Sequence, residues 1–328
     1  MLREKFGLDF YIDFNYIYSI NFLGMNAKIL SGETSLIPNF AIILLIALTI
    51  CQSNGKLYAQ SSKYRFQETI DLVNLVKDAS SEISQKGEHA FKEFMTKGSR
   101  WRNGDTYIFV CGLKGEIFVH EDASMVGKND YDRKDIHGKP IVQWFIRKAL
   151  GVGQCGWTHY EWVRPGRTTS SWKSSFVKLA RAPSGTIYVV GSGLYDMHME
   201  KEFAIDAVND ALSLVRTMGK DAFPTLRDTA SEFVYKDTYV FVLDTLCTTL
   251  VNPAEPLMEG RNQKDMQDVN GKFFVRDIVQ MASNNGQGWV EYMWPKPGTT
   301  KPVKKSSFVK KIVVKGEPLV VGTGVYLD

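Results

Sequence analysis

The chain has 328 residues, of which 44% are hydrophobic and 23% charged, proportions that are ordinary for a globular protein. That length is enough for two domains of common size. The formal net charge is only +4 and no long block of Lys or Arg occurs, which argues against a nucleic-acid-binding protein.

An uncharged apolar segment near the N-terminus, residues 36–51, is the targeting signal of the sequence. About 20 apolar residues are needed to cross a bilayer, so the segment is short for an anchor and typical of a signal-peptide core. Lys28 supplies a positive charge ahead of it, and Met25 is an alternative start. We expect residues 1–59 to be an extension with a signal peptide, or an anchor if uncleaved, and the protein to be periplasmic or secreted.

An internal repeat sets the organisation of the rest of the chain. Residues 156–178 align without gaps on residues 288–310, and 13 of these 23 pairs are identical. Both blocks begin with Gly-Trp and end with Lys-Ser-Ser-Phe-Val-Lys. Such a match indicates a duplicated domain. We therefore expect one domain over 60–196 and a second over 197–328.

Each copy reads in the same order of elements. Apolar residues at helical spacing predict a long helix at its start, and alternating, β-rich runs predict five strands with a short helix after the second. In the first copy the helices are expected at 64–98 and 139–150, and the strands at 106–110, 116–120, 156–163, 172–181 and 186–195. In the second copy the helices are expected at 198–230 and 271–284, and the strands at 238–242, 248–252, 288–294, 304–315 and 318–326.

Short connections between consecutive strands imply an antiparallel sheet. The long helix is expected on one face of that sheet and the loop with the short helix on the other. The predicted fold class is therefore α+β.

Four motifs recur in this order. They are DTYVFVLD (237–244), GWVEYMWP (288–295), KSSFV (305–309) and VGTGVYLD (321–328) in the second copy, and DTYIFV (105–110), GWTHYEW (156–162), KSSFV (173–177) and GSGLY (191–195) in the first. In order and repetition they resemble the Cache family, specifically the type-2 single Cache domain of extracytoplasmic bacterial sensors. The resemblance implies two tandem PAS-like domains, each with a ligand pocket above its sheet.

The same resemblance implies a function in chemotaxis or signal transduction. We expect an extracytoplasmic protein that binds a short organic acid or a similar small molecule, together with a membrane signalling partner. Because the sequence ends directly after Tyr326, we expect no output module of its own. A homodimer through the long helix is a further expectation. The alternative is a structural or protein-interaction module without a small-molecule ligand.

Residues two apart share one face of a strand, which groups aromatic and polar side chains with one lysine in each copy. Lys supplies charge for a carboxylate, while Tyr and Ser donate hydrogen bonds. The predicted ligand-contacting residues are Tyr107, His120, Tyr160, Trp162, Lys173 and Ser175 in the first copy. They are Tyr239, Asn252, Tyr292, Trp294, Lys305 and Ser307 in the second copy. The alternative is core packing for the aromatic residues and a solvated strand position for each lysine.

No arrangement typical of an enzyme or a metal centre occurs. The second copy contains no histidine, and the chain has no HExxH, no phosphate-binding loop and no nucleophile elbow. Cys111, Cys155 and Cys247 follow the apolar segment as an odd number without repeated spacing, so they form no disulfide framework. We predict that the protein is not an enzyme and uses neither a metal nor another cofactor.

Overall fold

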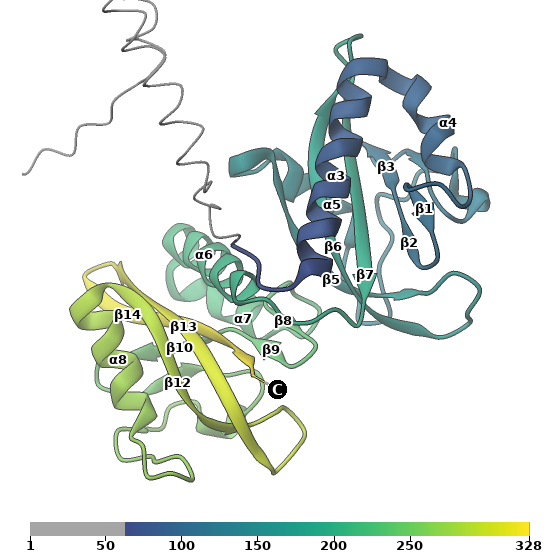
Figure 1. Cartoon of the computed structure of the whole chain (residues 1–328). Coiled ribbons are helices and arrows are strands. Elements are labelled where there is room, and N and C mark those ends of the chain that lie inside the picture. The colour runs from purple at the N-terminus through teal and green to yellow at the C-terminus, as the bar shows by residue number, and fades with distance from the viewer. Residues whose placement is uncertain (1–62, 328) are drawn as a thin grey trace, which may run out of the picture. The chain divides into compact units, whose positions relative to one another are not determined.

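A computed structural model describes residues 63–327. The expected signal segment 36–51, Lys28 and Met25 lie outside these residues. Within the described range, no helix is both long enough and apolar enough to span a membrane. Two five-stranded antiparallel sheets organise this part of the chain (Figure 1).

The first copy contains one of these sheets, with strand order β4-β3-β7-β6-β5. Its strands are β3 (Phe109–Gly112), β4 (Ile117–Val119), β5 (Cys155–Val163), β6 (Ser170–Arg181) and β7 (Ile187–Tyr195). A small hairpin precedes it, formed by β1 (Arg102–Asn103) and β2 (Thr106–Tyr107). Its helices are α3 (Gln67–Lys86), α4 (Ala90–Met95) and α5 (Ile141–Leu150), with short 3-10 turns at Gly87–His89, Ala123–Met125 and Val152–Gln154.

The second copy repeats this arrangement, with strand order β11-β10-β14-β13-β12. Its strands are β10 (Phe241–Asp244), β11 (Thr249–Val251), β12 (Gln287–Pro295), β13 (Pro302–Val314) and β14 (Glu317–Tyr326), preceded by a hairpin of β8 (Val234–Tyr235) and β9 (Thr238–Tyr239). Its helices are α6 (Lys201–Met218), α7 (Phe223–Arg227) and α8 (Phe274–Asn285), with 3-10 turns at Gly219–Ala222 and Pro256–Met258. The prediction of two α+β units with PAS-like antiparallel sheets is confirmed.

Four expected elements are divided in the structure, two in each copy. In the second copy the helix expected over 198–230 is interrupted at Gly219, which has a φ of 67°, and the strand expected over 238–242 is split at Val240. The first copy shows the same two divisions. The helix expected over 64–98 ends at Lys86, because Gly87 takes a φ of 60°, which favours glycine, and the chain then resumes as α4. The strand expected over 106–110 is split at Ile108, whose N–H donates to the carbonyl of Trp101 instead of extending the sheet.

Alternation along the strands gives each sheet two buried faces. In β6 the side chain of Phe176 packs with Val76 and Ile83 of α3, whereas Val177 packs with Phe145 of α5 on the opposite face. The second copy repeats this division, with α6 on one face and α8 on the other. The helices cover opposite faces of the sheet, as the sequence predicts (Figure 1).

A buried lysine of the first copy contacts the backbone of the second. Lys139 lies just before α5 and its side chain is fully buried. Its Nζ donates to the carbonyl oxygens of Thr229 at 2.9 Å, Ser231 at 2.6 Å and Val234 at 2.8 Å. The matching lysine of the second copy, Lys272, instead donates to a carbonyl of its own copy, that of Glu291.

Candidate functional site

The repeated lysine of each copy lies in the middle of its sheet. Lys173 of β6 is paired with Tyr160 of β5 on one side and with Tyr195 of β7 on the other. Its side chain points to the α5 face and is 1% exposed. The lysine Nζ lies 3.9 Å from the ring centroid of Tyr107 and 4.8 Å from that of Tyr195. Lys173 therefore lies between two tyrosine rings.

The second copy builds the same arrangement. Lys305 is paired with Tyr292 and Tyr326, and its Nζ lies 4.0 Å from the Tyr239 centroid and 4.8 Å from that of Tyr326. Neither lysine amine has a hydrogen bond or an ion pair within residues 63–327. Burial lowers the pKa of each lysine to about 7, although Asp105 and Glu121 oppose the shift for Lys173, as Asp237 does for Lys305. A buried, unpaired ammonium is costly, so an anion placed near it would be favoured.

Glycines in the last strand of each copy, β7 and β14, leave space for the lysine side chain because they have no Cβ. A Cβ placed on Gly193 would lie 2.8 Å from the Cε of Lys173 and would also meet the Ser175 hydroxyl. Gly324 stands in the same relation to Lys305 and Ser307. The repeated Gly-x-Gly is thus explained by close packing against the neighbouring strand, not by catalysis.

Each copy encloses a small space between its sheet and the helix on the lysine face, α5 in the first copy and α8 in the second, and we call this space the inner chamber. Its volume is about 30 Å³ in the first copy and about 40 Å³ in the second, room for a few water molecules at most. The two linings come from matching positions. In the first copy these include Tyr107, His120, Met125, Asp130, Arg133, Tyr160 and Trp162. In the second they include Tyr239, Asn252, Met258, Gln263, Met266, Tyr292 and Trp294.

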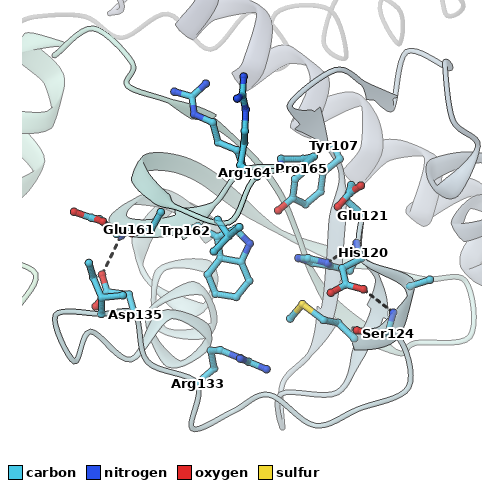
Figure 2. Close-up of a pocket in the computed structure, with 18 of the residues that line it drawn as sticks. Tyr107, His120, Glu121, Ser124, Arg133, Asp135, Glu161, Trp162, Arg164 and Pro165 are labelled. Atoms are coloured by element: carbon cyan, nitrogen blue, oxygen red, sulfur yellow. Dashed lines mark hydrogen bonds between the residues drawn. The ribbon is translucent and has the colours of Figure 1, made fainter.

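A much larger space adjoins the inner chamber of the first copy, and we call it the outer cleft. Its volume is about 910 Å³, within the range of small-molecule sites. Five residues line both spaces: Tyr107, His120, Met125, Arg133 and Trp162. Figure 2 shows Trp162, Tyr107 and His120 around this cleft, with Arg133 on a loop beside them. The chamber of the first copy is thus open to a ligand-sized space.

His120 is a neutral hydrogen-bond donor in this setting. The backbone N–H of Asp122 donates to its Nδ1 at 3.0 Å, which leaves the ring proton on Nε2. Burial and, to a lesser degree, the charge of Lys173 lower the pKa of His120 to about 4. The ring therefore stays uncharged near neutral pH, beside the Tyr107 ring at a centroid distance of 5.2 Å.

The structure brings most of the predicted site residues together. The aromatic residues, His120 and Asn252 line the inner chambers. The two lysines and two serines lie behind the lining. Ser175 and Ser307 form hydrogen bonds with the hydroxyls of Tyr160 at 2.8 Å and Tyr292 at 3.0 Å. These serine hydroxyls are therefore already engaged within the sheet.

Sequence reasoning missed two groups of residues. The first is Tyr195 and Tyr326, whose position at the end of the repeated Gly-x-Gly-x-Tyr places them on the same strand face as the glycines. The second is Asp130 and Arg133, which lie on an irregular loop. No strand or helix periodicity identifies loop residues as part of a chamber.

Comparison with known proteins identifies a family. A family model described as a Cache domain matches residues 56–328. Methyl-accepting chemotaxis protein McpP of Pseudomonas putida is 30% identical over 92 residues, which cover 28% of this chain and 16% of that protein. The chain therefore spans about a sixth of the length of that relative.

Solved structures give similar matches. One described as the periplasmic sensor domain of a chemotaxis protein is 30% identical, covering 40% of this chain and 100% of that one, with a TM-score of 0.35. A structure described as the basis for carboxylic acid recognition by a Cache chemosensory domain is 24% identical. It covers 39% of this chain and 93% of that one, with a TM-score of 0.34. At these TM-scores neither match decides the ligand or its site.

Proposed function

The chain belongs to the Cache domain family, and from this premise we propose that it is an extracytoplasmic, sensor-type protein that binds short organic acids. The proposed domains are residues 60–196 and 197–328, each with an anion position above its sheet. It acts by binding and not by catalysis, and it reports to a signalling partner in the membrane. A homodimer through α3 belongs to the same proposal.

The observation that carries this proposal is the pair of buried amines, Lys173 and Lys305. In the described part of the chain each lies between tyrosine rings without a hydrogen bond or an ion pair. An unpaired buried charge costs free energy that a bound carboxylate would recover. In the first copy, we infer that the carboxylate accepts hydrogen bonds from the Tyr107 hydroxyl and the His120 Nε2–H, with the Lys173 charge beneath them.

The dimensions of the site favour a small ligand. The inner chambers hold only about 30 and 40 Å³, so even a short acid requires side-chain movement to enter, and the outer cleft gives access in the first copy. A ligand of four to six heavy atoms gains at most about 1.5 kcal/mol per atom, or roughly 6–9 kcal/mol. We therefore expect dissociation constants from tens of micromolar to sub-micromolar.

A thermal-shift screen of the purified protein against short carboxylates, amino acids and amines tests the proposal. Binding to the folded state alone stabilises it by about 2.7 kcal/mol at a hundredfold excess over the dissociation constant. We expect carboxylates to raise the melting temperature of the wild type and of Lys178→Met, a control on the opposite face of β6. We expect no shift for the double variant Lys173→Met/Lys305→Met.

The second candidate function is a protein-interaction module. It is favoured by the small volume of both inner chambers, which their own side chains nearly fill. If no compound of the panel shifts the melting temperature of the wild type, ligand binding is wrong and this second function takes its place.

A further inference from the structure

The two inner chambers share their anion position but differ on one loop. Asp130 and Arg133 line the chamber of the first copy, and Gln263 and Met266 line that of the second. The two loops are equivalent, because an aspartate just beyond each pair makes the same bond. The Oδ2 of Asp135 accepts from the backbone N–H of Glu161 at 2.9 Å, and that of Asp268 accepts from Met293 at 2.9 Å.

In the first copy the loop presents an oriented ion pair. The Nε and Nη2 of Arg133 donate to the two carboxylate oxygens of Asp130 at 2.7 and 2.8 Å. A guanidinium has five N–H donors, so this fork uses two and leaves three without a partner among the described residues. The guanidinium also lies 5.9 Å from the Trp162 ring centroid. Since Arg133 lines both the chamber and the outer cleft, its remaining donors are available to a ligand.

In the second copy the same positions are uncharged. Met266 packs against the apolar cluster that contains Phe274 and Tyr292. Gln263 is buried, and the chamber is otherwise lined mainly by aromatic and aliphatic side chains. A hydroxyl or amino group entering this chamber would lose its hydration and find few partners. An alkyl group forms no hydrogen bonds with water, so it would lose none on entering this chamber.

We propose that Asp130 and Arg133 determine specificity, so that the first copy takes short carboxylates with a polar substituent and the second takes unsubstituted alkyl carboxylates. This inference rests on the proposed function, because the shared lysine holds the carboxylate in both copies. Asp130 and Arg133 receive the hydroxyl or amino group next to it. Gln263 and Met266 provide an apolar surface instead.

Single-lysine variants separate the two copies for the test. Lys305→Met leaves the first copy to bind, and Lys173→Met leaves the second. Each is titrated calorimetrically with propionate, lactate and alanine, which have one chain length and differ in a single substituent. We expect Lys305→Met to bind lactate or alanine about tenfold or more tighter than propionate, and Lys173→Met to show the reverse order.

Exchanging the loop residues decides the assignment. Adding Asp130→Gln/Arg133→Met to Lys305→Met should abolish the preference for the polar acid. Adding Gln263→Asp/Met266→Arg to Lys173→Met should create it. An unchanged order of affinities in both exchanged proteins overturns the inference and leaves the proposed function standing.

A different result would refute the proposed function itself. If the wild type binds none of the three acids, both the function and this inference are wrong. Circular dichroism checks that each variant is folded. Asp130→Gln/Arg133→Met introduces the two residues that the second copy has at the equivalent positions, so we expect it to fold. If one exchanged variant does not fold, the other exchange still tests the inference.

Discussion

The side-chain nitrogen of Lys173 lies 3.9 Å from the centroid of the Tyr107 ring. A cation over an aromatic ring gains about 2 kcal/mol when it is desolvated, which is less than the cost of removing an unpaired ammonium from water. The contact with Tyr107 therefore offsets only part of the cost. Stability alone does not account for a lysine at this position, whereas the proposed anionic ligand would.

The first prediction concerns pH. Burial lowers the pKa of Lys173 and Lys305 to about 7, below the ordinary lysine value of 10.5. Between pH 7 and that value the unfolded chain binds more protons than the folded chain, so the free energy of unfolding should rise with pH in this window. We expect Lys173→Met/Lys305→Met to remove most of the rise and to be more stable than the wild type at pH 6, by on the order of 3 kcal/mol.

Urea denaturation at a series of pH values between 6 and 9.5 measures this effect. Lys139, with a pKa lowered by burial to about 8, should leave a smaller rise in the double variant. A double variant with the full wild-type slope would show that the two lysines are not buried as described.

The second prediction concerns the last strand of the first copy. Gly193→Ala places a Cβ 2.8 Å from the Cε of Lys173 and 2.9 Å from the carbonyl oxygen of Ser174. The backbone oxygen cannot move away easily, so we expect a loss of about 1–3 kcal/mol and a displaced lysine. Thermal denaturation measures the loss. Gly151→Ala is the control, because its nearest atoms would lie at 3.4 Å, and an equal loss there would refute the packing argument.

The third prediction concerns the contact between the two copies. Lys139→Met leaves the carbonyls of Thr229, Ser231 and Val234 without their donor, and we expect it to destabilise the protein by roughly 3 kcal/mol. Lys272→Met removes one carbonyl bond and an exposed ion pair with Asp277, and it should cost about 1 kcal/mol. Calorimetry compares the two variants. Equal losses would mean that the Lys139 contact adds nothing specific.

Much of the fold can be predicted from the sequence, because the same pattern of helices and strands occurs in both copies of the repeat. The shared Lys-Ser-Ser-Phe-Val-Lys blocks lie at matching places in β6 and β13, and the alternation of Phe176 and Val177 correctly predicts which helix covers which face. Most strand bounds differ by only a few residues, whereas each long helix ends about 12 residues early, at a glycine with positive φ, Gly87 or Gly219.

The candidate site is harder to predict from the sequence than the fold. Strand alternation groups Tyr160, Trp162 and Lys173, but it cannot show that the Tyr107 ring lies between the lysine and the cleft. The contribution of Arg133 depends on the path of an irregular loop, and no local pattern encodes that path. The positions of such residues are determined by loop paths and by contacts between distant segments, and only the structure shows these.

Proton uptake on ligand binding tests the central claim most directly. At about pH 8 an amine with a pKa near 7 is largely neutral, and a bound carboxylate should raise that pKa and draw in a proton. Titration calorimetry of a short carboxylate in two buffers of different ionisation enthalpy measures the uptake. We expect close to one proton per bound ligand for the wild type, and neither binding nor uptake for Lys173→Met/Lys305→Met. Carboxylate binding without proton uptake, or undiminished in the double variant, would contradict the role of these lysines.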